Sequence, residues 1–207
     1  MHFAPADHPG LRPPGFKHSI YGALVVPRPI GWISTVSTEG VVNLAPFSFF
    51  NLVANDPLSC MYCANGSHAE GGLKDSLVNA RDTGEFVWNL CTWDLREEMN
   101  ATAASSPRTV DEMAAAGLQA APSIVVKPPR VALSPIAFEC VVDRIIDLPS
   151  SESTTNSMVI GRVVQLHIDE SVVVDGLIDP KCFRPLGRLG YHDYSVIDET
   201  FTLVRPA

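Results

Sequence analysis

The chain has 207 residues, of which 46% are hydrophobic and 18% are charged, with 15 Lys and Arg against 23 Asp and Glu. This composition is typical of one packed globular domain, and the net charge of -8 without a basic cluster argues against nucleic acid as a partner. No apolar run approaches the roughly 20 residues of a membrane-spanning helix, and the N-terminus shows no secretion signal, which favours a cytoplasmic protein without a membrane partner.

The first 18 residues are rich in proline and predict an N-terminal arm, followed by a single domain over 19–207. Five scattered cysteines without a secretion signal suit reduced intracellular thiols. In the segment CMYC, Cys60 and Cys63 would point to opposite faces of a strand, so we predict buried structural thiols rather than a metal or redox pair. The histidines show no metal-ligand spacing, so no metal site is predicted.

Strand signals dominate the chain. A short helical turn is expected to end before Pro27, and a strand follows over 29–37. The run VVNLAPFSFF predicts a second strand, which Pro46 marks as an edge or a bulge. Further strands are expected over 58–64, 85–91, 134–148, 157–169 and 200–206.

Helices are expected only between these strands. The segment 70–84 predicts a helix that Gly84 ends, and 94–117 predicts two helical segments, the first capped by Asp94 and the second closed by Gly117. Polar loops are expected over 149–156 and 179–194. Six or seven strands with inserted helices predict a mainly β fold, a closed antiparallel barrel with Greek-key-like connections, rather than a doubly wound sheet.

The segment from Arg28 to Asn51 has more small hydroxyl and amide residues than a purely structural strand pair needs. Hydroxyls there can bind phosphate oxygens, small or ring-locked residues let the backbone approach a ligand, and aromatic residues offer a flat surface. These features predict a nucleotide cofactor site formed by Trp32, Ser34, Thr35, Ala45, Pro46, Phe47, Ser48, Phe50 and Asn51. The alternative is a bulged edge strand with core phenylalanines. Trp32 and Trp88 could equally be core residues, and we assign Trp32 to the site and Trp88 to the core.

A second group of polar residues opens the helix after 70. Lys74, Asp75 and Ser76 predict a phosphate site, because the helix dipole, an ammonium group and a hydroxyl would all attract an anion. The alternative is a capped and solvated helix start. The helical segment after Asp94 is most simply solvated, although such an insertion can also form a lid over a cofactor.

No catalytic dyad is evident. Alternation predicts an exposed His167, whereas His192 in the loop GYHDY is a candidate contact for a nicotinamide or substrate. Glu139 is interpreted as a buried partner for an arginine or a backbone donor.

Seven motifs in this order, RPIGWIST, NLAPFSFFN, LKDS, TGEFVWNL, FECVV, IGRVVQLHI and RLGYHDY, resemble the flavin reductase-like family of FMN-binding split barrels. Within the family they resemble the branch of the small reductase component of nitrilotriacetate monooxygenase. The resemblance covers Ser19 to Tyr194. The family commonly has KDT where this chain has Ser76, and RLGG where it has RLGY.

The resemblance implies an FMN-dependent oxidoreductase that passes electrons from NADH or NADPH to a second acceptor. It places the FMN phosphate near the hydroxyls of Ser34 and Thr35 and near LKDS, and the flavin ring along the backbone of APFS. A homodimer and a monooxygenase component as a candidate partner are also implied. The alternatives are an FMN protein reduced by a protein partner, one acting on a dedicated organic substrate, or a non-catalytic flavin carrier or sensor.

Overall fold

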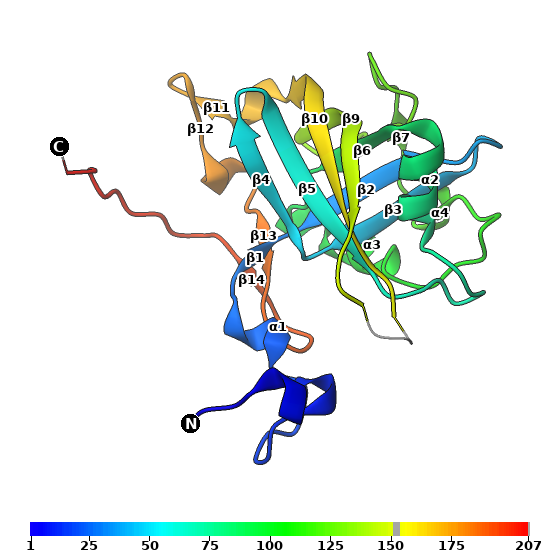
Figure 1. Cartoon of the computed structure of the whole chain (residues 1–207). Helices are drawn as coiled ribbons and strands as arrows, with labels where there is room; N and C mark the ends of the chain where they lie inside the picture. The colour runs from blue at the N-terminus through cyan, green and yellow to red at the C-terminus, as the bar shows by residue number, and fades with distance from the viewer. Residues whose placement is uncertain (151–153, 207) are drawn as a thin grey trace.

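A seven-stranded antiparallel sheet forms the centre of the computed structural model, which describes residues 1–150 and 154–206 (Figure 1). Its strands lie in the order β3-β2-β6-β9-β10-β5-β4. In chain order they are β2 (Gly31–Val36), β3 (Val42–Phe47), β4 (Phe50–Asn55), β5 (Leu58–Asn65), β6 (Glu85–Asn89), β9 (Ile136–Asp147) and β10 (Asn156–Ile168). The predicted mainly β, antiparallel fold is confirmed.

The two edges of this sheet, β3 and β4, are consecutive in the chain. Only Ser48 and Phe49 separate them, and the Phe49 carbonyl accepts a hydrogen bond of 2.9 Å from the amide of Cys63 on β5. The sheet must therefore curl until its edges meet at Ser48 and Phe49, which makes it a barrel split along β3 and β4. Pro46 lies within β3, and its place on an edge strand agrees with the prediction.

A separate three-stranded sheet combines distant parts of the chain. β1 (Arg28–Pro29) pairs with β13 (Leu186–Arg188), which pairs with β14 (Tyr194–Val196). The prediction of a loop over 179–194 is therefore wrong for β13 and the start of β14. Two small hairpins complete the strands: β7 (Ala120–Ala121) with β8 (Arg130–Val131), and β11 (Val173–Val174) with β12 (Leu177–Ile178).

The helices are short, and the longest begins at the predicted polar segment. They are α1 (Tyr21–Leu24), α2 (Asp75–Thr83), α3 (Arg96–Ala101) and α4 (Glu112–Ala115), with 3-10 turns η1 (Pro5–Asp7), η2 (Pro9–Leu11), η3 (Trp93–Leu95), η4 (Glu170–Val172) and η5 (Pro180–Cys182). Gly84 ends α2 in the left-handed conformation, with φ 73°, as predicted. The cap at Asp94 is wrong, because Asp94 lies inside η3; Asp111 instead accepts a capping bond from the Ala114 amide.

Strand β2 is buried on both faces, because two separate apolar clusters flank it. Ile33 points into the barrel with Phe86 and Trp88. Its neighbour Trp32 points to the other face, into a cluster with Met99 of α3 and Met113 of α4. The segment 94–117, which we call the helical insertion, therefore covers the outer face of β2.

The thiols of CMYC follow the predicted alternation. Cys60 is fully buried and its sulfur lies 3.7 Å from that of Cys140, whereas Cys63 is half-buried. The described residues contain no disulfide, and no cluster of three or more His, Cys, Asp or Glu among them could hold a metal ion.

Both termini extend away from the barrel (Figure 1). The strand predicted over 200–206 is wrong: this segment has no partner strand, and Phe201 is 85% exposed. Part of the polar loop predicted over 149–156, residues 151–153, lies outside the described residues, as does residue 207 of the predicted domain. No helix in the described ranges is long and apolar enough to cross a membrane.

Candidate functional site

Two cavities lie next to each other at the end of β3: Phe47 lines the first and Ser48 lines the second. The first, which we call the α2 cavity, has a volume of about 130 Å³ and lies between β3, the start of α2 and the segment after α3. It is lined by Asn43, Ala45, Pro46, Phe47, Ser67, His68, Lys74, Asp75, Ser76, Thr102, Ala103, Ala104, Ser105, Ser106 and Glu112. Hydroxyl, amide and charged groups predominate in this lining, so the cavity suits a polar or anionic ligand.

Lys74 is the ammonium group of the α2 cavity. It directly precedes the first residue of α2, and its Nζ lies 5.8 Å from the centre of the Phe47 ring. Partial burial lowers the pKa of Lys74. A helix N-terminus leaves backbone amides without an intrahelical acceptor, so the ammonium group and the start of α2 together favour an anion here.

Asp75 brings a negative charge to the same place, and the guanidinium group of Arg108 offsets it. Arg108 forms an ion pair with Asp75 and donates to the carbonyls of Gly71 and Leu73, each at 2.9 Å. His68 Nε2 lies 3.5 Å from the Asp75 carboxylate. These contacts tie the loop before α2 to the segment that precedes α4.

Glu112 of α4 holds the edge strand β3 from outside. Its carboxylate accepts hydrogen bonds from the Leu44 amide at 3.0 Å and from the Asn43 side chain. Burial raises the pKa of Glu112, and these two hydrogen bonds oppose that shift. The Leu44 amide points away from β2, and so does the nitrogen of Pro46, which lies two residues further along the strand. No strand in the described part of the chain pairs with β3 on that side, so the missing N–H of Pro46 costs no hydrogen bond to a neighbouring strand.

The α2 cavity brings together half of the predicted cofactor contacts: Ala45, Pro46, Phe47, Lys74, Asp75 and Ser76. Ser48 lies next to them but lines the second cavity. Phe50 is a core residue stacked on Trp88, with ring centres 5.2 Å apart, and Asn51 is exposed on β4. Trp88 is buried, as its interpretation as a core residue expected.

Three predicted contacts on β2 are not brought to either cavity. Trp32, Ser34 and Thr35 are fully buried. The Trp32 indole donates to the Thr102 hydroxyl at 2.9 Å, and Ser34 donates to the Pro129 carbonyl at 2.6 Å. Thr35 accepts from the Asn79 amide at 3.0 Å. Their polar groups therefore hold β2 to neighbouring segments.

Sequence reasoning missed several lining residues, most of which come from loops without a regular pattern; Asn43 of β3 and Glu112 of α4 are the exceptions. The missed residues are Asn43, Ser67, His68, Glu112 and the segment 102–106. The only signal was the run TAASSP, which places small and hydroxyl residues directly after a helix.

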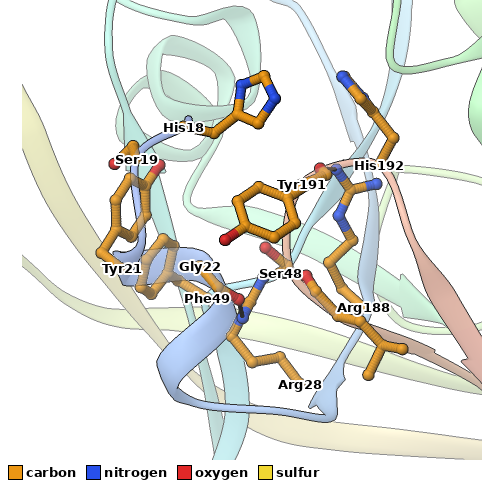
Figure 2. A pocket seen from close by; sticks show the side chains of 11 residues that line it. His18, Ser19, Tyr21, Gly22, Arg28, Ser48, Phe49, Arg188, Tyr191 and His192 are labelled. Carbon is orange, nitrogen blue, oxygen red and sulfur yellow. Dashed lines mark hydrogen bonds between the residues drawn. The ribbon is translucent and has the colours of Figure 1, made fainter. Parts of the chain in front are cut away.

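The second cavity, which we call the α1 cavity, has a volume of about 340 Å³ (Figure 2). It lies between α1, the β3–β4 connection and the β13–β14 turn. Its lining consists of His18, Ser19, Tyr21, Gly22, Arg28, Ser48, Phe49, Arg188, Leu189, Tyr191 and His192. The predicted substrate contact His192 thus lies in the α1 cavity, which adjoins the α2 cavity at Phe47 and Ser48.

Glu139 and His167 form a buried contact away from both cavities. The Glu139 carboxylate accepts from the amides of Ile124, Val125 and Val126 at 2.6–3.0 Å, as its interpretation as a partner for backbone donors expected. His167 Nε2 lies 2.5 Å from the same carboxylate, and its side chain is only 15% exposed. The prediction of an exposed His167 is wrong, because the loop that contains Ile124 packs over this face of the sheet.

Comparison with known proteins agrees with this geometry. A sequence model described as flavin reductase like domain matches residues 23–187. The chain is 36% identical over 193 residues to uncharacterized protein YwrF of Bacillus subtilis, which covers 92% of this chain and 93% of that one.

Two solved structures share the fold over nearly their whole length. Nitrilotriacetate monooxygenase component B from Bacillus cereus has a TM-score of 0.82 and 34% identity, covering 89% of this chain and 91% of that chain. The 2-nitrobenzoate 2-nitroreductase NbaA of Pseudomonas fluorescens has a TM-score of 0.82 and 27% identity, covering 100% and 96%. The split barrel, the polar α2 cavity and these matches together show that the chain belongs to the flavin reductase-like family.

Proposed function

We propose that the chain binds FMN with its phosphate in the α2 cavity and its ring along Ala45–Ser48. The observation that carries this proposal is the convergence, in one cavity, of the Lys74 ammonium group, the Ser76 hydroxyl, the start of α2 and an edge strand. Ammonium, hydroxyl and helix N-terminal amide groups suit a phosphate. The outer side of β3 lacks a partner strand, so backbone groups there can serve a ring.

We further propose an oxidoreductase of the NAD(P)H:flavin reductase type. A bound FMN would supply the redox chemistry, accepting hydride from NADH or NADPH and passing electrons to a second acceptor. The protein would bind and orient the ring and exclude competing reactions. This division of labour accounts for a site in which no side-chain dyad is needed.

A monooxygenase component is the partner that the likeness to nitrilotriacetate monooxygenase component B favours. We also propose a cytoplasmic homodimer. Support for the dimer comes from the edge strand β4, where residues 51–55 are all exposed and include the apolar Leu52 and Val53. An exposed apolar edge strand is a surface that proteins normally cover.

An enzyme acting on a dedicated organic substrate is the second candidate, because the α1 cavity adjoins the proposed ring position. The likeness to a structure named as a nitroreductase supports this alternative. A flavin carrier or sensor would bind FMN but would not turn over.

Steady-state oxidation of NADH and NADPH, with FMN and an artificial electron acceptor, tests the proposal. We expect nicotinamide oxidation that depends on protein, FMN and acceptor together. Tight FMN binding without nicotinamide oxidation would instead favour the second candidate or a carrier.

A further inference from the structure

The α1 cavity has an unusual charge for this chain. The whole protein has a net charge of -8, yet the cavity lining contains two arginines and two histidines and no Asp or Glu. Charges of one sign around a concave surface raise the local concentration of the opposite ion. The α1 cavity therefore favours an anion.

Arg28 and Arg188 supply the permanent charges, and neither forms an ion pair with a carboxylate in the described part of the chain. Arg28 is a structural link, because it donates to the carbonyls of Gly22, Val25 and Leu189. Arg188 donates once, to the Tyr191 carbonyl at 2.5 Å, and packs 4.4 Å from the centre of the Tyr194 ring. The guanidinium group of Arg188 thus retains donors for a planar oxyanion such as a carboxylate.

Aromatic rings form the other walls. Tyr21 and Phe49 are nearly parallel, with an interplanar angle of 14° and ring centres 6.4 Å apart. The Tyr191 ring projects into the space between the Tyr21 side and the Arg188 side (Figure 2). It also lies 5.5 Å from the ring of His18, so the N-terminal arm contributes to the cavity wall.

The backbone of Tyr191 is held in an unfavourable conformation. Its φ of 59° is left-handed, a region that residues other than glycine rarely adopt. Gly190, the residue before it, packs so closely on α1 that an added Cβ would lie 2.5 Å from that of Ala23. Two buried polar atoms in the cavity lining, Ser19 Oγ and Arg28 Nε, also have no hydrogen-bond partner. Strain and unpaired polar groups of this kind cluster at ligand sites.

We propose that the α1 cavity binds a monocyclic aromatic carboxylate, with Arg188 as the partner of the carboxylate and Tyr191 as a specificity-determining wall. A volume of about 340 Å³ suits one substituted ring, since it lies at the small end of the roughly 300–1,000 Å³ of ligand pockets. The inference rests on the second candidate of the proposed function and deepens it, because it names the chemical class of the organic ligand in the α1 cavity.

Calorimetric titration with benzoate tests the proposal. It is carried out once with FMN at saturating concentration and once without FMN, so that the test does not depend on FMN binding. We expect benzoate to bind one site per chain with and without FMN. Benzamide should bind at least tenfold more weakly, because it lacks the charge, and cyclohexanecarboxylate should also bind more weakly, because it is not flat.

Equal binding of benzoate and benzamide, or of benzoate and inorganic phosphate, would overturn the proposal. Loss of benzoate binding on adding FMN would show that the cavity belongs to the flavin ring, and would overturn it as well.

Three variants in the cavity and one control outside it locate the site. Arg188→Gln should weaken benzoate binding roughly ten- to a hundredfold, the usual range for a charged hydrogen bond. Arg188→Lys should recover part of that loss, and Arg144→Gln, which removes an exposed arginine of β9, should have no effect. Tyr191→Gly should weaken benzoate binding while leaving the melting temperature unchanged or higher, because glycine relieves the left-handed backbone. Unchanged benzoate affinity in both Arg188→Gln and Tyr191→Gly would contradict the assignment.

Discussion

Arg108 and Asp75 form an ion pair at the start of α2, beside the proposed phosphate position. Arg108 lies 33 residues beyond Asp75, in the segment that leads to α4, so the helical insertion supplies the charge that neutralises a carboxylate of the cavity. Without this cation, Asp75 would repel a phosphate bound near Lys74. The insertion therefore has an electrostatic role as well as covering the outer face of β2.

Arg108→Gln should weaken FMN binding about tenfold, because it exposes the phosphate to an unpaired Asp75. Fluorescence titration of FMN measures the affinity. The double variant Arg108→Gln with Asp75→Asn should recover most of it, whereas Arg81→Gln, which breaks an exposed ion pair near the other end of α2, should not change it. If the double variant binds FMN as weakly as the single one, Arg108 acts by ordering the loop through Gly71 and Leu73 instead.

Lys74→Gln separates phosphate binding from ring binding. It should reduce FMN affinity about tenfold and leave riboflavin, which lacks the phosphate, bound as in the wild type. Lys127→Gln, on an exposed residue outside both cavities, is the matched control. Parallel losses for FMN and riboflavin would argue that Lys74 contacts the ring or supports the fold.

Glu139 links stability to pH. Burial raises its pKa, but hydrogen bonds from Ile124, His167, Val125 and Val126 outweigh burial and lower the pKa to about 2. A carboxyl group whose pKa falls on folding stabilises the protein above its unfolded pKa, here 4.5, and loses that effect as the pH falls towards 2. The shift corresponds to roughly 3 kcal/mol.

Glu139→Gln should therefore lower the free energy of unfolding by about 2–3 kcal/mol at pH 7, and by much less at pH 3. Urea unfolding at several pH values measures this difference, with Glu170→Gln on an exposed carboxylate as the control. A difference that stays constant between pH 7 and pH 3 would contradict the role of ionised Glu139.

Leu52 tests the proposed dimer. It is 51% exposed on the edge strand β4, so Leu52→Lys would place a charge in an apolar interface and should convert a dimer to a monomer. Light scattering after size exclusion measures the mass. Leu133→Lys is the control, because Leu133 is 71% exposed and lies outside β4. A monomeric wild type, or equal effects of both variants, would contradict an interface at β4.

The long apolar runs of β9 and β10 were predictable because their own sequence carries the strand signal. β13 and β14 were not, because each has three residues and β13 pairs with Arg28–Pro29, far away in the chain. Local pattern also failed at 200–206, where alternating residues have no strand to pair with.

In the candidate site, too, only residues with a local sequence signal were predictable. Lys74 and Ser76 could be found because a helix start has a recognisable sequence, and Ala45–Ser48 because proline on a strand indicates an edge. Ser34 and Thr35 were assigned to phosphate because short hydroxyls cluster where the first predicted strand gives way to the turn. In the structure Ser34 bonds to the Pro129 carbonyl and Thr35 to the Asn79 side chain of α2, and these tertiary contacts have no signal within the strand itself.

Anaerobic stopped-flow reduction of the FMN-loaded protein tests the central claim most directly. Oxidised flavin absorbs visible light and reduced flavin does not, so absorbance follows electron transfer within one turnover. The account predicts rapid bleaching with NADH or NADPH in the wild type, and weaker binding of FMN in Lys74→Gln. Firmly bound FMN that neither nicotinamide bleaches would contradict it.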